Sequence, residues 1–402
     1  CLLASRERPT SAVLVVGTTA CGLAAICTVA LVAVRAAVVL VAFAIAKEAA
    51  WHWELAFART AVLLIATLAL WQGFQAPTVR RIEVPLQGLP TAADGYTICM
   101  LSDLHAGPTT GAAEIRSIVE RTATLGCQAI VFNGDIAEGT VEERAADMQE
   151  LLPLTSATPD GVYFVPGNHE FYNFAAPGGG RAAAAAWTQW WAAHGVRPLN
   201  NSQVTLPLGK GKQWLTLAGI DDPLGFPDWN AALRGSAQGA HDKEGSLPLP
   251  RLLMAHRPSP HIWEASRRGV AAQLSGHTHG GQLWPVQLPA SWSSDGFLSG
   301  LYRVNTTTLY VSDGTVGSYM TRLRLLTQAE VSQVILRTAT TAGSRALAHG
   351  WRQEGLGVVL GWILFALVAT ALGLTAGAAA NRRCGGTRGT GGKYRAPVEG
   401  NY

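Results

Sequence analysis

The sequence is poor in charged residues, which make up 14% of the chain, compared with roughly 25% of an average soluble protein. The shortage is local, because residues 11–34, 60–79 and 355–381 contain no Asp, Glu, Lys or Arg. Each of these segments is long enough to cross the roughly 30 Å hydrocarbon layer of a bilayer as a helix. Residues 36–46 are also nearly uniformly apolar, but they are too short to cross alone. We therefore expect an integral, multi-pass membrane protein with two or three N-terminal spans and one C-terminal span; for residues 355–381 the alternative is a buried hydrophobic helix.

Cysteine forms no recognisable pattern, since the six cysteines include no Cys-x-x-Cys pair. This excludes a thiolate metal site and gives no support for a disulfide framework. Cys99 and Cys127 fall in or beside apolar segments, where we expect small core residues. The chain starts with Cys1 instead of a methionine, so we expect it to be a piece of a longer protein.

Signals for nucleotide and nucleic-acid binding are missing as well. The glycine run at residues 178–180 is not followed by the Lys-Ser/Thr of a P-loop, so a flexible insertion is the better interpretation. Trp187, Trp190 and Trp191 repeat at a spacing that places them on one helix face, where we expect core packing and not base stacking. We predict no nucleic-acid partner.

The end of the chain carries a positive bias. Residues 382–402 are rich in glycine and contain five basic residues against one acidic residue. Short basic flanks of membrane spans tend to stay in the cytoplasm. We therefore expect a disordered cytoplasmic tail, and we expect residues 78–340 to lie on the non-cytoplasmic face.

Between the apolar ends, strand-like and helix-like segments alternate, which predicts an α/β domain. Short apolar runs predict strands at residues 98–101, 129–132, 162–165, 214–220, 252–255, 271–274 and 308–311. Helical spacing predicts helices near residues 115–122, 141–152 and 181–194. The predicted organisation is a membrane region at residues 1–77, a domain at 78–340, a transmembrane helix at 355–381 and a tail at 382–402.

Five of the predicted strands are followed directly by side chains that bind metals. The motifs are SDLHAG at residues 102–107, NGDI at 133–136, PGNHE at 166–170, AHRP at 255–258 and SGHTHGGQ at 275–282. They offer carboxylate, imidazole and amide groups without a thiolate, a set that hard or borderline divalent cations accept. Because open α/β sheets place their sites at the carboxyl ends of strands, we expect these side chains to converge on a site for two ions.

Each motif alone is weak, since an isolated buried histidine is more often a core residue than a ligand. The prediction depends on the five motifs occurring together at strand ends. Other histidines occur in no comparable setting and are interpreted as surface, helix or interfacial residues: His52, His194, His241, His261 and His349.

The order of these motifs resembles the calcineurin-like metallophosphoesterase superfamily over residues 97–279, and the apolar segments resemble the subgroup of transmembrane proteins with a metallophosphoesterase domain. The resemblance implies a four-layered α/β/β/α sandwich and two divalent metal ions (Mn, Zn or Fe). One ion would be held by Asp103, His105 and His279, and the other by Asn168, His256 and His277. Asp135 would bridge the two ions.

The resemblance also implies an activity. A hydroxide shared by the two ions would attack phosphorus, and the non-ligand His169 would stabilise or protonate the leaving group. We interpret Glu170 as a loop anchor, and Asp221 and Asp222 as turn or capping residues. The predicted function is hydrolysis of phosphate mono- or diesters at a membrane, with phospholipids or lipid-linked phosphates as candidate substrates. The alternative is a non-catalytic membrane scaffold that keeps the same fold.

One position departs from the subgroup pattern. Members commonly carry an Arg in a Ser-Arg-Gly turn after the last core strand, whereas Asp313 occupies that position here. The difference leaves the metal ligands unchanged and alters the expected substrate contacts at the rim. Arg322 or Arg324 is either a replacement for the missing charge or an ordinary solvated arginine.

Overall fold

The computed structural model describes residues 51–172, 178–208, 212–234, 249–283, 287–317 and 322–339. The apolar segments at residues 11–34, 36–46 and 355–381, and the tail, lie outside these residues. The chain divides into two compact units, residues 1–28 with 64–353 and residues 29–63 with 354–402. Of the second unit, the described residues are 51–63, the first part of helix α2 (Trp51–Gly73). All interactions below lie within the first unit.

Helix α2 covers residues 60–73 of the segment 60–79 that was predicted as a membrane span, whereas residues 74–79 are not helical. The helix starts at Trp51, includes Glu54 and Arg59, and ends at Gly73. Thr78 then opens strand β1 (Thr78–Leu86). Pro77 lacks an amide hydrogen and disfavours a helical conformation in the residue before it, so the helix cannot continue through this segment. In the part of the chain that is described, no helix is both long and apolar enough to cross a membrane.

Within the residues listed above, twelve strands form two six-stranded sheets. The order in the first sheet is β1, β12 (Glu330–Thr338), β2 (Thr97–Leu101), β3 (Ala129–Asn133), β4 (Val162–Val165) and β5 (Val196–Pro198). The order in the second sheet is β10 (Gly300–Val304), β11 (Thr307–Val311), β9 (Ala272–Ser275), β8 (Arg251–Met254), β7 (Lys212–Gly219) and β6 (Ser202–Leu208). Strands β2, β3 and β4 run parallel in one sheet, and β7, β8 and β9 run parallel in the other.

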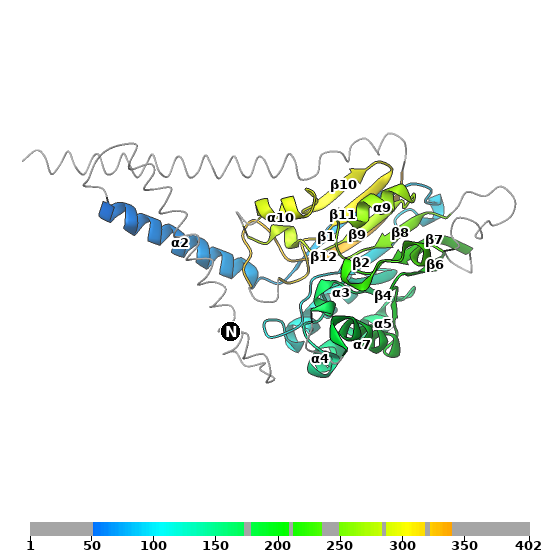
Figure 1. Cartoon of the computed structure of the whole chain (residues 1–402), viewed down its shortest axis with the longest axis horizontal. Coiled ribbons are helices and arrows are strands. Elements are labelled where there is room, and N and C mark those ends of the chain that lie inside the picture. Colours follow the sequence, from blue (N-terminus) through cyan, green and yellow to red (C-terminus); the bar gives the residue numbers. More distant parts are fainter. Residues whose placement is uncertain are drawn as a thin grey trace, which may run out of the picture. The chain divides into compact units, whose positions relative to one another are not determined.

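The two sheets pack face to face around the largest core cluster, which combines Val84, Met100 and Val165 of the first sheet with Leu217 and Met254 of the second. Helices cover the outer face of each sheet (Figure 1). On the first sheet these are α3 (Ala112–Ala123), α4 (Val141–Met148), α5 (Pro153–Ala157) and α7 (Gly179–Ala193). On the second they are α8 (Trp229–Ala232) and α9 (His261–Arg267). The predicted α/β/β/α layering is confirmed for the described residues.

The tryptophans of α7 also behave as predicted. Trp187 and Trp191 are fully buried, and Trp190 packs against the same cluster. Their indoles join α7 to the sheet, since Trp191 contacts the rings of Phe132 and Phe164. These side chains are core residues.

A disulfide joins Cys99 and Cys127, for which the cysteine spacing in the sequence gave no support. Both cysteines are buried, as expected for core residues. Cys99 lies opposite Ile130 in the parallel pairing of β2 with β3, and Cys127 lies just before β3. The register of the strands therefore brings the two sulfurs together over a separation of 28 residues, a relationship that local cysteine spacing does not reveal.

Candidate metal centre

The structure brings the predicted ligands together at the carboxyl ends of parallel strands. β2 leads to Asp103 and His105, β3 leads to Asp135, and β4 leads to Asn168, the first residue of the short helix α6 (Asn168–Phe171). In the second sheet, β8 leads to His256, and β9 leads to His277 and His279. Strand polarity therefore directs side chains from both sheets to one place.

The potential ligand atoms form two adjacent clusters. In the first, the ligand atoms of Asp103, His105 and His279 lie within 4.8 Å of one another. In the second, those of Asp135, His256 and His277 lie within 4.8 Å of one another. The first cluster contains the three residues predicted for one ion, whereas the second joins His256 and His277 to Asp135, the predicted bridging residue, and not to Asn168. His105 forms a further group of this kind with Glu138 and His169, and a divalent ion could be held in each.

Asp135 lies between the two clusters. Its Oδ2 is 3.0 Å from Nε2 of His256 and 3.9 Å from Nε2 of His105. Within the first cluster, Nε2 of His105 is 3.2 Å from Nε2 of His279. Two imidazole nitrogens at this distance, beside two carboxylates, are arranged as a cation would require.

Hydrogen bonds on the far side of the rings orient the donor atoms. Nδ1 of His256 lies 2.8 Å from the carbonyl oxygen of Asn133, which can only accept, so Nδ1 carries a hydrogen and Nε2 is the nitrogen that would offer its lone pair to a cation once its proton is displaced. Nδ1 of His105 is bonded to the carboxylate of Glu138 in the same way. Oδ1 of Asn168 is buried and accepts no hydrogen bond from the described residues. These lone pairs suit the binding of a metal.

The glycines of the motifs allow the ligands to approach closely. A Cβ atom at Gly134 would lie 2.5 Å from Nδ1 of His256, and one at Gly167 would lie 2.2 Å from Oδ1 of Asp135. A Cβ at Gly276 would lie 2.3 Å from Oδ2 of Asp103. Any side chain at these positions would therefore displace a potential ligand.

Left-handed backbone conformations also concentrate here. The φ angles of five potential ligands are positive: 56° at Asp103, 46° at His105, 53° at Asp135, 72° at His277 and 52° at His279. Each costs about 1–3 kcal/mol in a non-glycine residue and persists only where the surroundings impose it. Such strain is typical of a functional site.

The carboxylate of Glu170 holds two of the motif loops together. It accepts hydrogen bonds from the backbone N–H groups of Asp135 at 3.0 Å, Ile136 at 2.8 Å and Gly167 at 2.7 Å. Glu170 is 2% exposed, so its bonds are shielded from water. It anchors the loops, as predicted.

His169 lies beside the clusters without belonging to either of the two ligand sets above. Its Nδ1 is 2.7 Å from Oε1 of Glu138, the oxygen that also bonds His105. The backbone N–H of His169 donates to Oδ1 of Asp135. The sequence analysis missed Glu138, although an acidic residue three positions after Asp135 in the same loop was an available signal.

The histidines of the site differ in pKa. Burial lowers the pKa of His277 to about 3 and places that of His279 far below its ordinary value, so both are neutral and able to bind a cation. For His256 and His169, burial is the largest effect and lowers the pKa, but the charge of Asp135, the other nearby acids and the hydrogen bonds of each ring together outweigh it. The resulting pKa is about 10 for His256 and about 9 for His169.

The two buried aspartates, Asp103 and Asp135, also differ in pKa. Burial raises the pKa of Asp103. Burial acts in the same direction on Asp135, but the charges of His256, His169 and His105 and the hydrogen bond to His256 together hold its pKa well below the ordinary value. Asp135 is therefore the persistent anion of the site, and a cation would replace the proton on His256.

Residues 96–281 match the family described as calcineurin-like phosphoesterase. These residues are a calcineurin-like phosphoesterase domain.

Relatives of the phosphoesterase domain share its sequence at moderate identity. The chain is 32% identical over 69% of its length to a "transmembrane protein with metallophosphoesterase domain" from Danio rerio, and 31% identical over 69% to the protein of that name from Bos taurus. It spans 62% and 61% of their lengths. Among solved structures, it is similar to a dimetal phosphatase from Danio rerio, with 14% identity, a TM-score of 0.34 and coverage of 56% of this chain and 88% of that one.

Two arginines of the phosphoesterase domain are buried, which corrects their interpretation as ordinary solvated arginines. Arg322 is buried and donates to both carboxylate oxygens of Glu114, at 2.6 and 2.7 Å. Arg324 is buried and donates to the carbonyl oxygens of Val316 at 2.7 Å and Asp313 at 2.8 Å. Buried guanidinium groups need such partners, so the two residues hold the surrounding loops.

The remaining predicted residues have structural roles. Asp222 caps the turn that follows it by accepting from the N–H of Leu224, and it also accepts from Nε of Arg257 at 2.6 Å. Asp221 accepts from Nδ2 of Asn200 at 2.9 Å. His261 begins helix α9, but it is buried and not at the surface.

Proposed function

We propose that this chain is a metal-dependent phosphoesterase that hydrolyses phosphate mono- or diesters at a site for two cations. The observation that carries the proposal is the position of Asp135 between two three-residue clusters, with His169 beside them. A scaffold without activity has no need for His169 and its partner Glu138. We take residues 78–340 as the extent of the domain, because β1 and β12 pair along their whole length in the first sheet.

The chain offers a complete donor set. Asp103, His105 and His279 would hold one cation; Asn168, His256 and His277 would hold the other; and Asp135 would be shared. When bound, two divalent ions would polarise the phosphoryl group and lower the pKa of a bound water. The chain itself fixes the donor atoms, excludes bulk water from the buried ligands and positions a proton on His169.

His169 is placed to serve the leaving group. Its side chain is 22% exposed, whereas those of His105 and His256 are 1% and 0% exposed. In the protein without metal, burial lowers its pKa but the charges of Asp135 and Glu138 and the hydrogen bond to Glu138 together raise it to about 9. Since Nδ1 is bonded to Glu138, Nε2 is the nitrogen that can donate to the departing alkoxide oxygen.

The test is turnover of chromogenic phosphomonoesters and phosphodiesters by purified protein that has been stripped of metal and resupplied with manganese, zinc or iron. We expect activity only after metal is added. His169→Ala should lower kcat by about a hundredfold or more, as for loss of a general acid, and Asp135→Asn should lower it at least as much, because it removes the carboxylate that both cations would share. Turnover that needs no metal, or that survives both substitutions, would overturn the proposal, and an absence of turnover on every ester would favour the scaffold.

We further propose that the chain is anchored in a membrane with this domain on the non-cytoplasmic side. Its apolar segments and the printed names of its relatives support the anchor. The Cys99–Cys127 disulfide supports the orientation, because disulfides persist in oxidising compartments. Phospholipids and lipid-linked phosphates are then the substrates within closest reach. Protease accessibility of the domain in sealed vesicles of known orientation tests the placement.

A further inference from the structure

Arg257 directly follows the potential ligand His256, in the loop between β8 and α9. Its Nη1 lies 3.4 Å from Nε2 of His277, a member of the second cluster. The side chain of Arg257 is 25% exposed, whereas that of His256 is fully buried. A guanidinium group stays charged at physiological pH. A permanent positive charge therefore lies beside the second cluster and within reach of solvent.

The contacts of Arg257 hold the side chain in place without engaging all of its donors. Nε donates to Oδ2 of Asp222 at 2.6 Å, and Tyr172 is a further hydrogen-bond partner of the guanidinium. Asp222 is buried in the turn after β7, so this ion pair fixes the arginine from one side. Together with His277, these partners engage three of the five N–H groups of a guanidinium. The described residues thus leave donors for a ligand.

Tyr172 connects Arg257 to the predicted acid. It follows helix α6, which contains His169, and the rings of Tyr172 and His169 lie 4.8 Å apart. Tyr172 is 44% exposed, and the side chain of His169 is 22% exposed. Arg257, Tyr172 and His169 therefore form a solvent-accessible row beside the buried ligands. A substrate that approaches the ligands from solvent would contact this row.

His277 would add a second donor next to Arg257 when a cation is bound. Its Nδ1 is buried and has no hydrogen-bond partner among the described residues, so Nδ1 is the nitrogen that could bind the cation. A neutral imidazole that binds a cation through Nδ1 carries its hydrogen on Nε2. Nε2 of His277 and Nη1 of Arg257 would then be two donors 3.4 Å apart, and neither could accept from the other. An anionic oxygen can accept from both.

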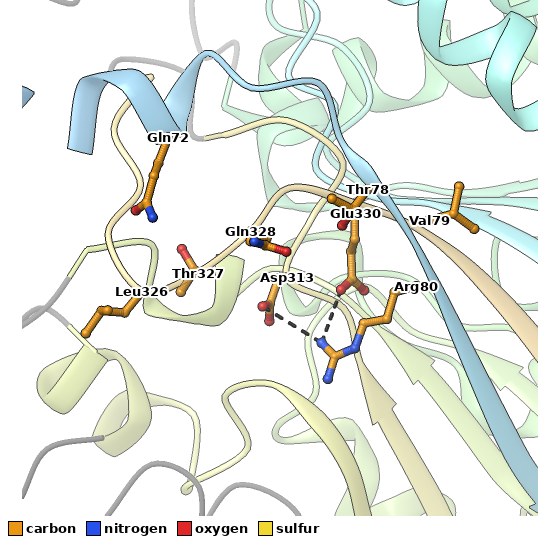
Figure 2. Close-up of a pocket in the computed structure, with 9 residues that line it drawn as sticks. All are labelled: Gln72, Thr78, Val79, Arg80, Asp313, Leu326, Thr327, Gln328 and Glu330. Atoms are coloured by element: carbon orange, nitrogen blue, oxygen red, sulfur yellow. Dashed lines mark hydrogen bonds and ion pairs between the residues drawn. The ribbon is translucent and has the colours of Figure 1, made fainter. Parts of the chain in front are cut away.

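Three other arginines of the domain are less well placed. Arg322 and Arg324 are buried in the loop contacts described above. Figure 2 shows Arg80, whose Nη1 lies 3.1 Å from Oε2 of Glu330 and 3.9 Å from Oδ2 of Asp313. The cavity that Arg80 lines has a volume of about 630 Å³, and its lining includes none of the predicted metal ligands. Arg257 is therefore better placed than these three to contact a substrate at the cation site.

We propose that Arg257, together with Nε2 of His277, binds a charged phosphoryl oxygen of the substrate and favours phosphomonoesters over phosphodiesters. Arginine forms charge-assisted hydrogen bonds with phosphate and can bond it through two nitrogens. A monoester dianion carries one more negative charge than a diester, so the guanidinium stabilises the bound monoester more. The proposal names a substrate class and rests on the proposed function.

Two esters with the same leaving group test the preference: p-nitrophenyl phosphate and bis-p-nitrophenyl phosphate, at a mildly alkaline pH where the monoester is a dianion. Arg257→Gln should lower kcat/KM for the monoester by about 10- to 100-fold, the size of one charge-assisted hydrogen bond, and for the diester by clearly less. Arg267→Gln, the same change at an exposed arginine of α9 that is bonded to Glu264, should keep both values. An equal loss for both esters would overturn the monoester preference, and wild-type values for both in Arg257→Gln would overturn the contact.

Chemical rescue separates a direct contact from a structural role, since Arg257 also partners the buried Asp222. Guanidinium chloride, far below denaturing concentrations, should restore part of the monoester turnover of Arg257→Ala and leave Arg267→Ala unchanged. Arg257→Lys keeps a cation beside Asp222 and should lose part of the preference, because lysine lacks the planar fork. Thermal unfolding checks that each variant folds. Wild-type preference in Arg257→Lys, without rescue of Arg257→Ala, would show that the arginine serves only Asp222.

Binding of inorganic phosphate separates this proposal from the proposed function. Calorimetric titration of phosphate into the metal-loaded full chain should give a Kd about 10- to 100-fold higher for Arg257→Gln than for the wild type or Arg267→Gln. If no ester is hydrolysed but this change is seen, the proposed function fails and the anion site stands. If esters are hydrolysed but phosphate binds Arg257→Gln as it binds the wild type, the anion site fails and the phosphoesterase stands.

Discussion

At the residue scale, Glu138 connects the metal ligands to the proton donor. One of its oxygens bonds Nδ1 of His105, a predicted ligand, and Nδ1 of His169, the predicted acid. The carboxylate is buried, and its pKa lies below the ordinary value, because the hydrogen bonds of His105 and His169 outweigh the opposing effect of burial. A single side chain therefore fixes the orientation of two imidazoles that have different tasks.

Glu138→Gln should therefore weaken metal binding and turnover together. The amide cannot accept from both imidazole N–H groups with the strength of a carboxylate, and loss of such an outer partner costs about 10- to 100-fold in metal affinity or activity. Metal content by mass spectrometry and kcat at saturating metal are the measurements. Glu142→Gln, in the exposed first turn of α4, is the matched control and should retain both. Wild-type values in Glu138→Gln would show that the contact has no role.

Two glycines at helix starts differ in how closely other residues surround them. Gly167 and Gly111 both precede the first turn of a helix, α6 and α3 respectively, but their surroundings differ. A Cβ at Gly167 would collide with Asp135, whereas one at Gly111 meets nothing within 4 Å. We expect Gly167→Ala to abolish binding of the second metal and to cost about 1–3 kcal/mol in the free energy of unfolding, as for overpacking. Gly111→Ala, measured by the same denaturant titration and metal analysis, should match the wild type.

At the element scale, strand polarity explains why the potential ligands could be predicted from sequence. Each motif directly follows a short apolar run, and parallel strands place their carboxyl ends at one edge, so Asp103, Asp135 and His256 meet without any further information. Glu138 was harder to find, because its role depends on which ring nitrogen it contacts. The disulfide was also missed, because it depends on the register of β2 against β3.

Strand β1 was not predicted from the sequence, for a different reason. Its sequence carries Arg80, Arg81 and Glu83, and its first residues were interpreted as part of an apolar helix. The strand is stabilised instead by cross-strand contacts with β12, where Glu83 accepts from Arg337 and Arg81 donates to Gln333. These partners are about 250 residues away in the sequence, so the local pattern of charges gave no indication of a strand.

Helix α9 should make stability sensitive to acid. Burial lowers the pKa of His261 to about 4, although the charge of Asp222 opposes the shift. The unfolded chain protonates near pH 6.5, so the stabilising contribution of the neutral ring is complete above that pH and is lost as the pH falls toward 4. The loss amounts to about 3 kcal/mol. Chemical denaturation between pH 7 and pH 4 should therefore show a smaller decrease for His261→Gln than for the wild type, and parallel curves would contradict the assignment.

At the scale of the whole molecule, the site exists only when both sheets are packed together. The first sheet supplies Asp103, His105, Asp135 and Asn168, and the second supplies His256, His277 and His279. Neither sheet alone has both clusters, because Asp103 and His105 need His279 while Asp135 needs His256 and His277. The core between the sheets, and not the loops alone, therefore sets the spacing of the donor atoms.

The Cys99–Cys127 disulfide is a covalent link within the first sheet, which carries Asp103 and Asp135. It closes a loop of 28 residues between the strands that lead to Asp103 and Asp135. In the loop-entropy estimate, a link of this length stabilises the folded state by about 3–4 kcal/mol. The double variant Cys99→Ser, Cys127→Ser should have a free energy of unfolding that is lower by that amount. It should unfold at the same denaturant concentration as the reduced wild type. A double variant as stable as the oxidised wild type would show that the bond contributes nothing.

The redox state of Cys99 and Cys127 in the cell shows which compartment the domain faces. If residues 78–340 face an oxidising compartment, Cys99 and Cys127 should resist maleimide when membranes are lysed in its presence, and both should react only after reduction and unfolding. A domain that faces the reducing cytoplasm should present both thiols to maleimide as soon as it is unfolded, without a reductant. Peptide mass mapping distinguishes the two results at named residues, and the second would reverse the proposed orientation while leaving the geometry of the metal centre intact.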